Sequence, residues 1–128
     1  MQISRKRSGM IKDLAILRQA GALARHASAR HAVIAENISN SDTPGYKAKD
    51  IPAFDAEAAK AAKSGDADLE RRYLQPQILK GLESAPNGNT VNLEDQMLRA
   101  ADTQSQHTAA TTIYRKVIEL TRLSVSTR

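Results

Sequence analysis

Apolar and small residues recur at helical spacing through the first third of the chain. No proline occurs between Met10 and about Ser39, and the recurring positions alternate in steps of four and three residues, which is heptad spacing. They are Met10, Leu14, Leu17, Gly21, Ala24, Ser28, His31, Ala35 and Ile38. The pattern predicts a helix over residues 10–39, capped near Ser8, whose small central residues let another backbone approach closely. Its apolar surface is widened by Ile16, Leu23, Ala27 and Ile34, which predicts more than one neighbour.

A turn is predicted where this helix ends, within residues 37–46. Pro44 disfavours helical geometry at Thr43. Pro44 and Gly45 fit the two central positions of a type II turn, because proline presets φ at the first position and glycine accepts a positive φ at the second. The chain is therefore expected to bend sharply between Thr43 and Tyr46.

A second long helix is predicted to begin near Asn92. Asn92 can cap the helix with Asp95 three positions on, and the acidic Glu94 and Asp95 suit the positive end of the helix dipole. Its apolar positions are Leu93, Met97, Ala100, Ala101, Ile113, Tyr114, Val117, Ile118, Leu120 and Val125, and residues 102–108 between them are polar. Two long helices at the two ends of the chain predict an antiparallel pair.

The segment between the helices gives the weakest pattern. An Ala-rich stretch, residues 53–63, predicts a short helix, and residues 85–89 predict a loop. Few large apolar residues are available, so this segment cannot build much of a core by itself. We expect it to be partly extended and to order against neighbouring chains. The predicted organisation is a mainly α chain: a helix and turn over 1–46, an irregular or extended segment over 47–90, and a helix over 91–128 that pairs with the first as an antiparallel coiled coil.

Composition favours thin helical packing over a compact globule. The chain has one Phe, three Tyr and no Trp, and alanine supplies much of its 41% hydrophobic content. Burying an alanine side chain stabilises a core far less than the roughly 1.5–3 kcal/mol of a leucine or phenylalanine. An elongated helical arrangement suits such residues better.

Positive charge is concentrated at both ends of the chain. The net charge is +5, with seven basic and one acidic residue in 1–35, seven and eleven in 36–95, and five and two in 96–128. This asymmetry is consistent with chain ends that meet an acidic neighbour or the middle of another copy. It fits nucleic-acid binding less well, because no aromatic residues are interleaved with the basic ones.

The sequence contains no pattern that predicts catalysis or metal binding. Cysteine is absent, so no disulfide or thiolate site is expected. His26 and His31 lie five apart, which turns them about 140° from each other on a helix, and His107 stands alone. The run Asp66–Glu70 resembles the start of a calcium-binding loop. Such a loop would lack the glycine required at its sixth position, and Gln77 stands where the last ligand should be a glutamate. We expect no catalytic residue, metal, cofactor or small-molecule substrate.

Two sequence blocks resemble those of flagellar rod and hook proteins. Residues 35–47, Ala-Glu-Asn-Ile-Ser-Asn-Ser-Asp-Thr-Pro-Gly-Tyr-Lys, resemble the signature Ala-x-Asn-Ile/Leu-Ala-Asn-x-x-Thr-Pro-Gly-Tyr at the end of the first helix, with Ser39 in place of alanine. Residues 88–97, Gly-Asn-Thr-Val-Asn-Leu-Glu-Asp-Gln-Met, are similar to the start of the C-terminal helix in the FlgB family of proximal rod proteins. Asn92 replaces an aspartate there, and His107 stands where that family often has tyrosine.

The resemblance implies which residues serve assembly. The motif positions are Asn37, Ile38, Asn40, Thr43, Pro44, Gly45, Tyr46, Asn89, Thr90, Val91, Leu93 and Met97. The helix seam, from the heptad pattern, takes Leu14, Leu17, Gly21 and Ala24 of the first helix and Ile113, Val117 and Leu120 of the second. All of these residues are expected to be structural.

The resemblance also implies a function. The chain would be a structural subunit whose terminal helices line an axial tube, the periplasmic rod of the basal body, and transmit torque without chemistry. Its partners would be further copies of itself, other rod proteins, the rod–MS-ring junction protein, the MS ring and the export gate. Lys12 and Asp13 interrupt the first apolar run, so no cleaved signal peptide is expected and export would use the flagellar type III apparatus. Three alternatives stay open: a FlgC-like rod protein, a basic helical-hairpin module that binds nucleic acid or an acidic protein, and, more remotely, a small regulatory enzyme.

Overall fold

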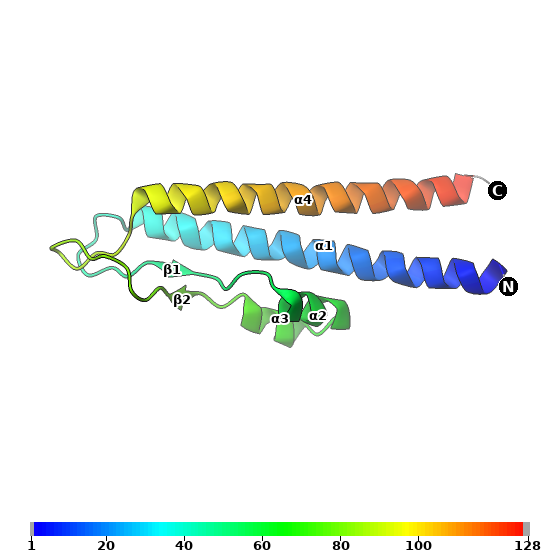
Figure 1. Cartoon of the computed structure of the whole chain (residues 1–128), viewed down its shortest axis with the longest axis horizontal. Helices are drawn as coiled ribbons and strands as arrows, with labels where there is room; N and C mark the ends of the chain where they lie inside the picture. Colours follow the sequence, from blue (N-terminus) through cyan, green and yellow to red (C-terminus); the bar gives the residue numbers. More distant parts are fainter. Residues whose placement is uncertain (1, 127–128) are drawn as a thin grey trace.

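Two long antiparallel helices form most of the molecule. The computed structural model describes residues 2–126 and contains α1 (Gln2–Ser39) and α4 (Leu93–Ser126), which lie side by side along their lengths (Figure 1). The start of α1 and the end of α4 therefore lie at the same end of the molecule. This arrangement confirms the predicted fold: mainly α, with paired terminal helices and a short middle segment. Among the described residues, no helix is apolar enough over a sufficient length to cross a membrane.

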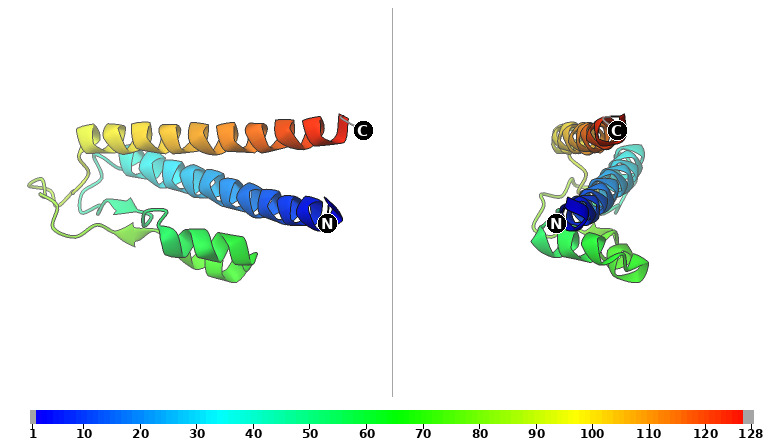
Figure 2. Two further views of the ribbon diagram at one scale, coloured as in Figure 1. Left: turned by 45° about the vertical axis from the view of Figure 1, so that its right-hand side comes forward. Right: turned by 90° about the vertical axis from the view of Figure 1, so that its right-hand side faces the viewer.

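The middle segment forms a third layer against α1. It contains β1 (Lys49–Asp50), α2 (Ala56–Ser64), α3 (Ala67–Tyr73) and β2 (Gln77–Ile78). The two strands pair antiparallel, with Lys49 opposite Ile78 and Asp50 opposite Gln77. These elements lie along α1, which stands between most of this layer and α4 (Figure 2), while Asp50 of β1 reaches Arg99 of α4.

Packing of the middle segment differs in part from the prediction. The Ala-rich helix is confirmed as α2, which Asp55 caps by accepting a hydrogen bond from the Ala58 N–H at 2.9 Å. The segment was expected to order against neighbouring chains, and the structure shows it ordered against α1 of its own copy. Ala58, Ala61 and Ala62 are buried, and Phe54 and Ala58 meet the buried Ala22 and His26 of α1. A small apolar layer forms within one copy because α1 supplies the missing half of it.

The first helix begins earlier than predicted. It starts at Gln2, so Ser8 is not its N-cap, and Gly9 lies inside the helix. A glycine lowers helix stability by about 1 kcal/mol relative to alanine but does not end a helix by itself. The preceding Arg5 and Lys6 are good helix formers, and this part of α1 runs beside Thr121 and Val125 of α4. Its first turns therefore extend alongside the end of α4.

The contact between α1 and α4 is built on small and polar residues at heptad spacing. The buried residues of α4 are Gln96, Thr103, Ala110 and Val117, each seven positions after the last. On α1 the buried residues Ala20, Ala27 and Ile34 show the same interval. Residues seven apart return to the same side of a helix in a coiled coil, so these two rows form its contact line.

The predicted seam lies to one side of this contact. Leu14 is 52% exposed, and Leu17, Gly21 and Ala24 are only half-buried. A Cβ added to Gly21 would meet only the side chain of Arg25, so no second backbone approaches Gly21 within the chain. On α4, Val117 is buried in the contact, whereas Ile113 and Leu120 are 40% and 62% exposed. The heptad spacing is therefore correct, but its predicted position is wrong for the contact inside one copy. The sequence offered two rows of small residues, and the row through Ala20 and Ala27 packs against α4.

Candidate functional site

The predicted turn is present and ends the first helix. The Tyr46 N–H donates to the Thr43 carbonyl at 3.2 Å, and Gly45 has a φ of 74°, which confirms a type II arrangement. Asn40 holds the last helical turn by donating from Nδ2 to the Glu36 carbonyl at 2.9 Å. Its Oδ1 accepts a hydrogen bond from the Thr43 hydroxyl at 3.1 Å. The polar residues after Ser39 thus replace the helical hydrogen bonds that are lost there.

The second sequence block closes over this turn. Asn89 is 3% exposed, and its Nδ2 donates to the carbonyls of Asn40 and Thr43, both at 2.8 Å. The Gly45 N–H donates to the Asn87 carbonyl at 2.9 Å. Gly88, with a φ of 85°, comes so close that a Cβ on it would lie 3.4 Å from the Gly45 Cα. Two blocks more than 40 residues apart therefore form one structure, which we call the joint: residues 37–49 and 85–92.

Asn37 is the centre of the joint. Its side chain is fully buried, and Nδ2 donates to the Lys49 carbonyl at 2.7 Å and to Gln96 Oε1 at 3.0 Å. Its Oδ1 accepts from the Lys49 N–H and from the Tyr46 hydroxyl, both at 3.1 Å. One amide group therefore ties α1 to β1, to the turn and to α4.

Thr90 and Tyr46 complete the joint. The Thr90 N–H donates to the Tyr46 carbonyl at 3.0 Å, and Thr90 Oγ1 accepts from the buried Ala48 N–H at 2.9 Å. Partial burial of the phenol and the nearby Glu36 carboxylate raise the pKa of Tyr46. Tyr46 therefore stays a neutral hydrogen-bond donor. The predicted cap of α4 is also confirmed, because Asn92 Oδ1 accepts from the Asp95 N–H at 3.1 Å.

A buried carboxylate links the middle segment to both long helices. Asp50 of β1 is 6% exposed and is held by Arg30 of α1 through two hydrogen bonds of 2.9 and 3.0 Å. Arg99 of α4 binds the same carboxylate, and its Nε donates to Asp95 at 2.8 Å. Burial alone would raise the pKa of Asp50, but the hydrogen bonds from Arg30, the Ile51 N–H and Arg99 outweigh it and hold the pKa below its ordinary value.

A third polar bridge passes through His26. The ring is 2% exposed, and its Nε2 lies 2.6 Å from the Pro52 carbonyl, which can only accept a hydrogen bond. Its Nδ1 accepts from Gln106 Nε2 of α4 at 2.7 Å. Phe54 packs edge-on against the ring, with centroids 5.7 Å apart. His26 is therefore a structural link between three elements.

The three bridges set the register of the molecule. His26, Arg30 and Asn37 fall on one side of α1. His26 and Asn37 bind Gln106 and Gln96 of α4 directly, whereas Arg30 and Arg99 of α4 bind the same Asp50 carboxylate. A slip of either helix by one turn would leave several buried polar groups without partners, which is costly. The small apolar residues of the α1–α4 contact are thus supplemented by polar contacts of defined geometry.

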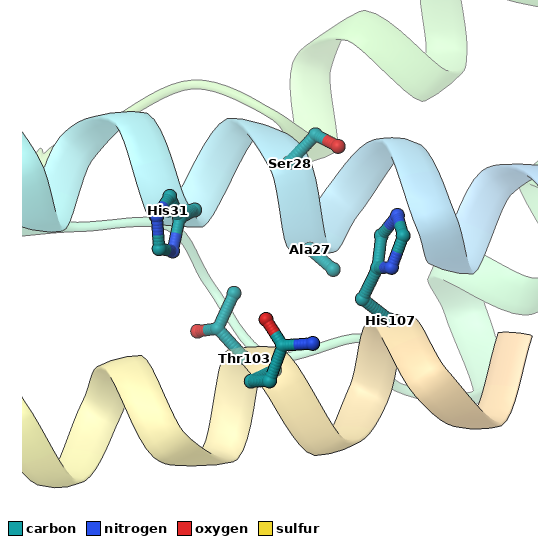
Figure 3. A pocket seen from close by; sticks show the side chains of 6 residues that line it. Ala27, Ser28, His31, Thr103 and His107 are labelled. Atoms are coloured by element: carbon teal, nitrogen blue, oxygen red, sulfur yellow. The ribbon is translucent and has the colours of Figure 1, made fainter.

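A shallow pocket of about 310 Å³ lies between α1 and α4 on the opposite side from the middle segment. His31 and His107 border it from the two helices, with Ala27 and Thr103 between them (Figure 3), and Ser28 and Gln104 complete its lining. Over residues 2–126, no group of three or more His, Cys, Asp or Glu side chains is arranged to hold a metal ion. The pocket is a gap between packed helices beside small side chains.

The predicted residues divide into two groups. Eight form hydrogen bonds within the joint: Asn37, Asn40, Thr43, Gly45, Tyr46, Asn89, Thr90 and Val91. The other four motif residues, Ile38, Pro44, Leu93 and Met97, are exposed. Six residues of the polar bridges were not predicted: His26, Arg30, Asp50, Gln96, Arg99 and Gln106. Five of them are polar residues of the two long helices and Asp50 lies in β1, and no local pattern connects them.

Comparison with known proteins supports one family. Residues 16–47, from the middle of α1 through the turn, match the family model described as flagella basal body rod protein. A search of curated proteins found no match. The matched residues include Asn37 and the turn of the joint, so the match supports placement in the rod family and a structural role in the flagellar basal body.

Proposed function

We propose that the chain is a proximal rod subunit of the FlgB type. The rod match ends at residue 47, so the subtype rests on the second block, Asn89 to Leu93, which the joint places directly on the rod signature. In this proposal the protein is exported through the flagellar type III apparatus. It then joins the MS ring, the rod–MS-ring junction protein and the export gate to further rod proteins.

The observation that carries an assembling role is the exposure of large apolar side chains along both terminal helices. Ile3, Met10, Ile11 and Leu14 of α1 are more than half exposed, as are Leu98 and Leu120 of α4. The contact inside the chain mostly buries alanine, threonine and glutamine, and its large apolar residues are Ile34 and Val117. Apolar surface left open along two helices is typical of a protein that covers it with neighbours. The predicted seam residues Leu17, Gly21 and Ala24 lie on the same open side of α1 and would serve such contacts.

The proposal is tested by fractionation and crosslinking in cells. A short epitope inserted at the exposed residue Glu83 should copurify with isolated basal bodies, and recovery only in the soluble fraction would contradict the assignment. A photoreactive amino acid at the exposed Leu14 should crosslink to rod subunits there. A crosslink to the rod–MS-ring junction protein supports the FlgB type, whereas crosslinks to rod subunits alone favour the FlgC-like alternative.

A further inference from the structure

One face at the free end of α1 combines apolar and basic residues. Ile3, Arg7, Ile11, Leu14 and Arg18 follow one another in steps of four or three residues, so they share one side of the helix, and all five are exposed. We call these five residues the basic face. The side of α1 that meets α4 at this end is a different one, formed by Lys6, Gly9 and Asp13. Within residues 2–126, neither Arg7 nor Arg18 forms an ion pair.

A second face, at the other end of the molecule, has the opposite charge. Glu94, Met97, Leu98, Ala101 and Asp102 lie on the outer side of α4 near its start, and all are exposed. We call these five residues the acidic face. Arg99, the one basic residue nearby on α4, is turned inward and is bound to Asp50 and Asp95. The acidic face therefore presents apolar side chains and negative charge, and among the described residues neither Glu94 nor Asp102 forms an ion pair.

The two faces cannot meet within one copy. The basic face lies at the same end of the molecule as the end of α4. There, other residues of α1, Lys6 and Met10, approach Thr121 and Val125. The acidic face lies at the start of the same helix, and its 34 residues span about 51 Å. Each copy therefore carries one surface of each kind at opposite ends.

We propose that the basic face of one copy binds the acidic face of a second copy. The contact would bury Ile11 and Leu14 against Met97 and Leu98 and set Arg7 and Arg18 against Glu94 and Asp102. Because the two surfaces differ, each copy donates one and accepts the other, and such contacts repeat without closing into a dimer. The inference rests on the proposed assembling role and names the surfaces that carry it.

Charge reversal with a mixing experiment tests this contact. Arg7→Glu/Arg18→Glu makes both faces acidic, and Glu94→Arg/Asp102→Arg makes both basic. Each variant alone should therefore require at least about tenfold more protein to associate than the unmodified chain, a change of about 1.4 kcal/mol. An equimolar mixture should associate again, since each acidic end then meets a basic one. Sedimentation velocity at low salt measures this, and raised salt should weaken association of the unmodified chain.

A matched control carries the same charge change elsewhere. Lys60→Glu/Lys80→Glu alters two exposed lysines of the middle segment and should associate like the unmodified chain. Circular dichroism checks that every variant keeps its helices. Variants that associate normally, a mixture that fails to recover, or an unmodified chain that stays monomeric at every concentration would each overturn this contact. None of these results bears on whether the chain is found in basal bodies, which tests the proposed function separately.

Discussion

Asn37 of α1 and Gln96 of α4 are joined by a fully buried hydrogen bond of 3.0 Å. The two residues are not equivalent. Asn37 makes three further hydrogen bonds, to Lys49 and Tyr46, whereas Gln96 Nε2 has no partner among the described residues. All side-chain hydrogen-bonding groups of Asn37 are therefore paired, whereas one of Gln96 is not. Substitutions of the two residues should have unequal effects on stability.

Replacing Asn37 should weaken the fold far more than replacing Gln96. Asn37→Leu leaves the part-buried N–H and carbonyl of Lys49 without their side-chain partner and also removes the partner of the Tyr46 hydroxyl, so it should lower the free energy of unfolding by about 3 kcal/mol. Gln96→Met is the matched control: it fills a similar volume and removes an unpaired donor, but it leaves one Asn37 N–H without an acceptor, so it should cost about 1 kcal/mol. Thermal unfolding followed by circular dichroism measures both. Equal losses would show that Asn37 is not the centre of the joint.

Stability should depend on the ionisation of Asp50. Its folded pKa is lowered, so the unfolded state takes up the proton first as pH falls. The contribution of Asp50 is then complete above its ordinary pKa of about 4 and is lost as pH falls through the lower folded value. Asp50→Asn should destabilise the protein by about 2 kcal/mol at pH 7, in the range for a charge-assisted contact, and the difference should shrink toward pH 2. Glu83→Gln, at an exposed loop position, serves as the control with little effect at either pH. A difference independent of pH would contradict the ion pairs.

Two glycines should respond to alanine in opposite directions. Gly45 has a φ of 74°, where a Cβ costs about 1–2 kcal/mol, so Gly45→Ala should destabilise the joint. Gly9 lies inside α1 with nothing within 4 Å of an added Cβ, so Gly9→Ala should raise helix content by removing a flexible residue. Circular dichroism and thermal unfolding compare the two variants. A neutral Gly45→Ala would argue against the type II turn.

The isolated monomer should be ordered at the joint and frayed at the free end of the helix pair. Residues 3–19 of α1 and 118–126 of α4 contain no buried residue, so little stabilises these turns without a neighbour. Hydrogen exchange should be fast there and slow over residues 22–37 and 96–117. Circular dichroism of the dilute monomer should show less helix than the full length of α1 and α4. A monomer that is fully helical and melts cooperatively would contradict this expectation.

Gly21→Leu should impair assembly without unfolding the monomer. Gly21 is half-buried, and an added Cβ would meet only the exposed guanidinium of Arg25, which is bound to Glu70. We therefore expect the monomer to accept a larger side chain here by moving Arg25. A neighbouring helix packed against the small residues around Gly21 could not accept it. Gly21→Ala is the conservative comparison. Motility of the leucine variant in soft agar, with its protein level checked, should be reduced; normal motility would count against a role for this side of α1.

Local features were predictable from sequence, and contacts between distant segments were not. Pro44 with Gly45 and Asn92 with Asp95 act within four residues, so turn chemistry and capping rules identify them. The bond from Asn89 to the Asn40 and Thr43 carbonyls spans more than 45 residues, and no local rule connects them. The register of α1 was missed because Gly21 and Ala24 looked as suitable for close packing as Ala20 and Ala27. The contact line of α4 was not predicted because two of its buried heptad positions, Gln96 and Thr103, are polar residues.

The central claim is that this chain is a structural part of the flagellar rod. Its most direct test is deletion of the chain followed by isolation of basal bodies and electron microscopy. We predict particles that retain the membrane ring but have no rod, with rods and motility restored when the unmodified chain is expressed again. Complete rods in the deletion strain would contradict the claim.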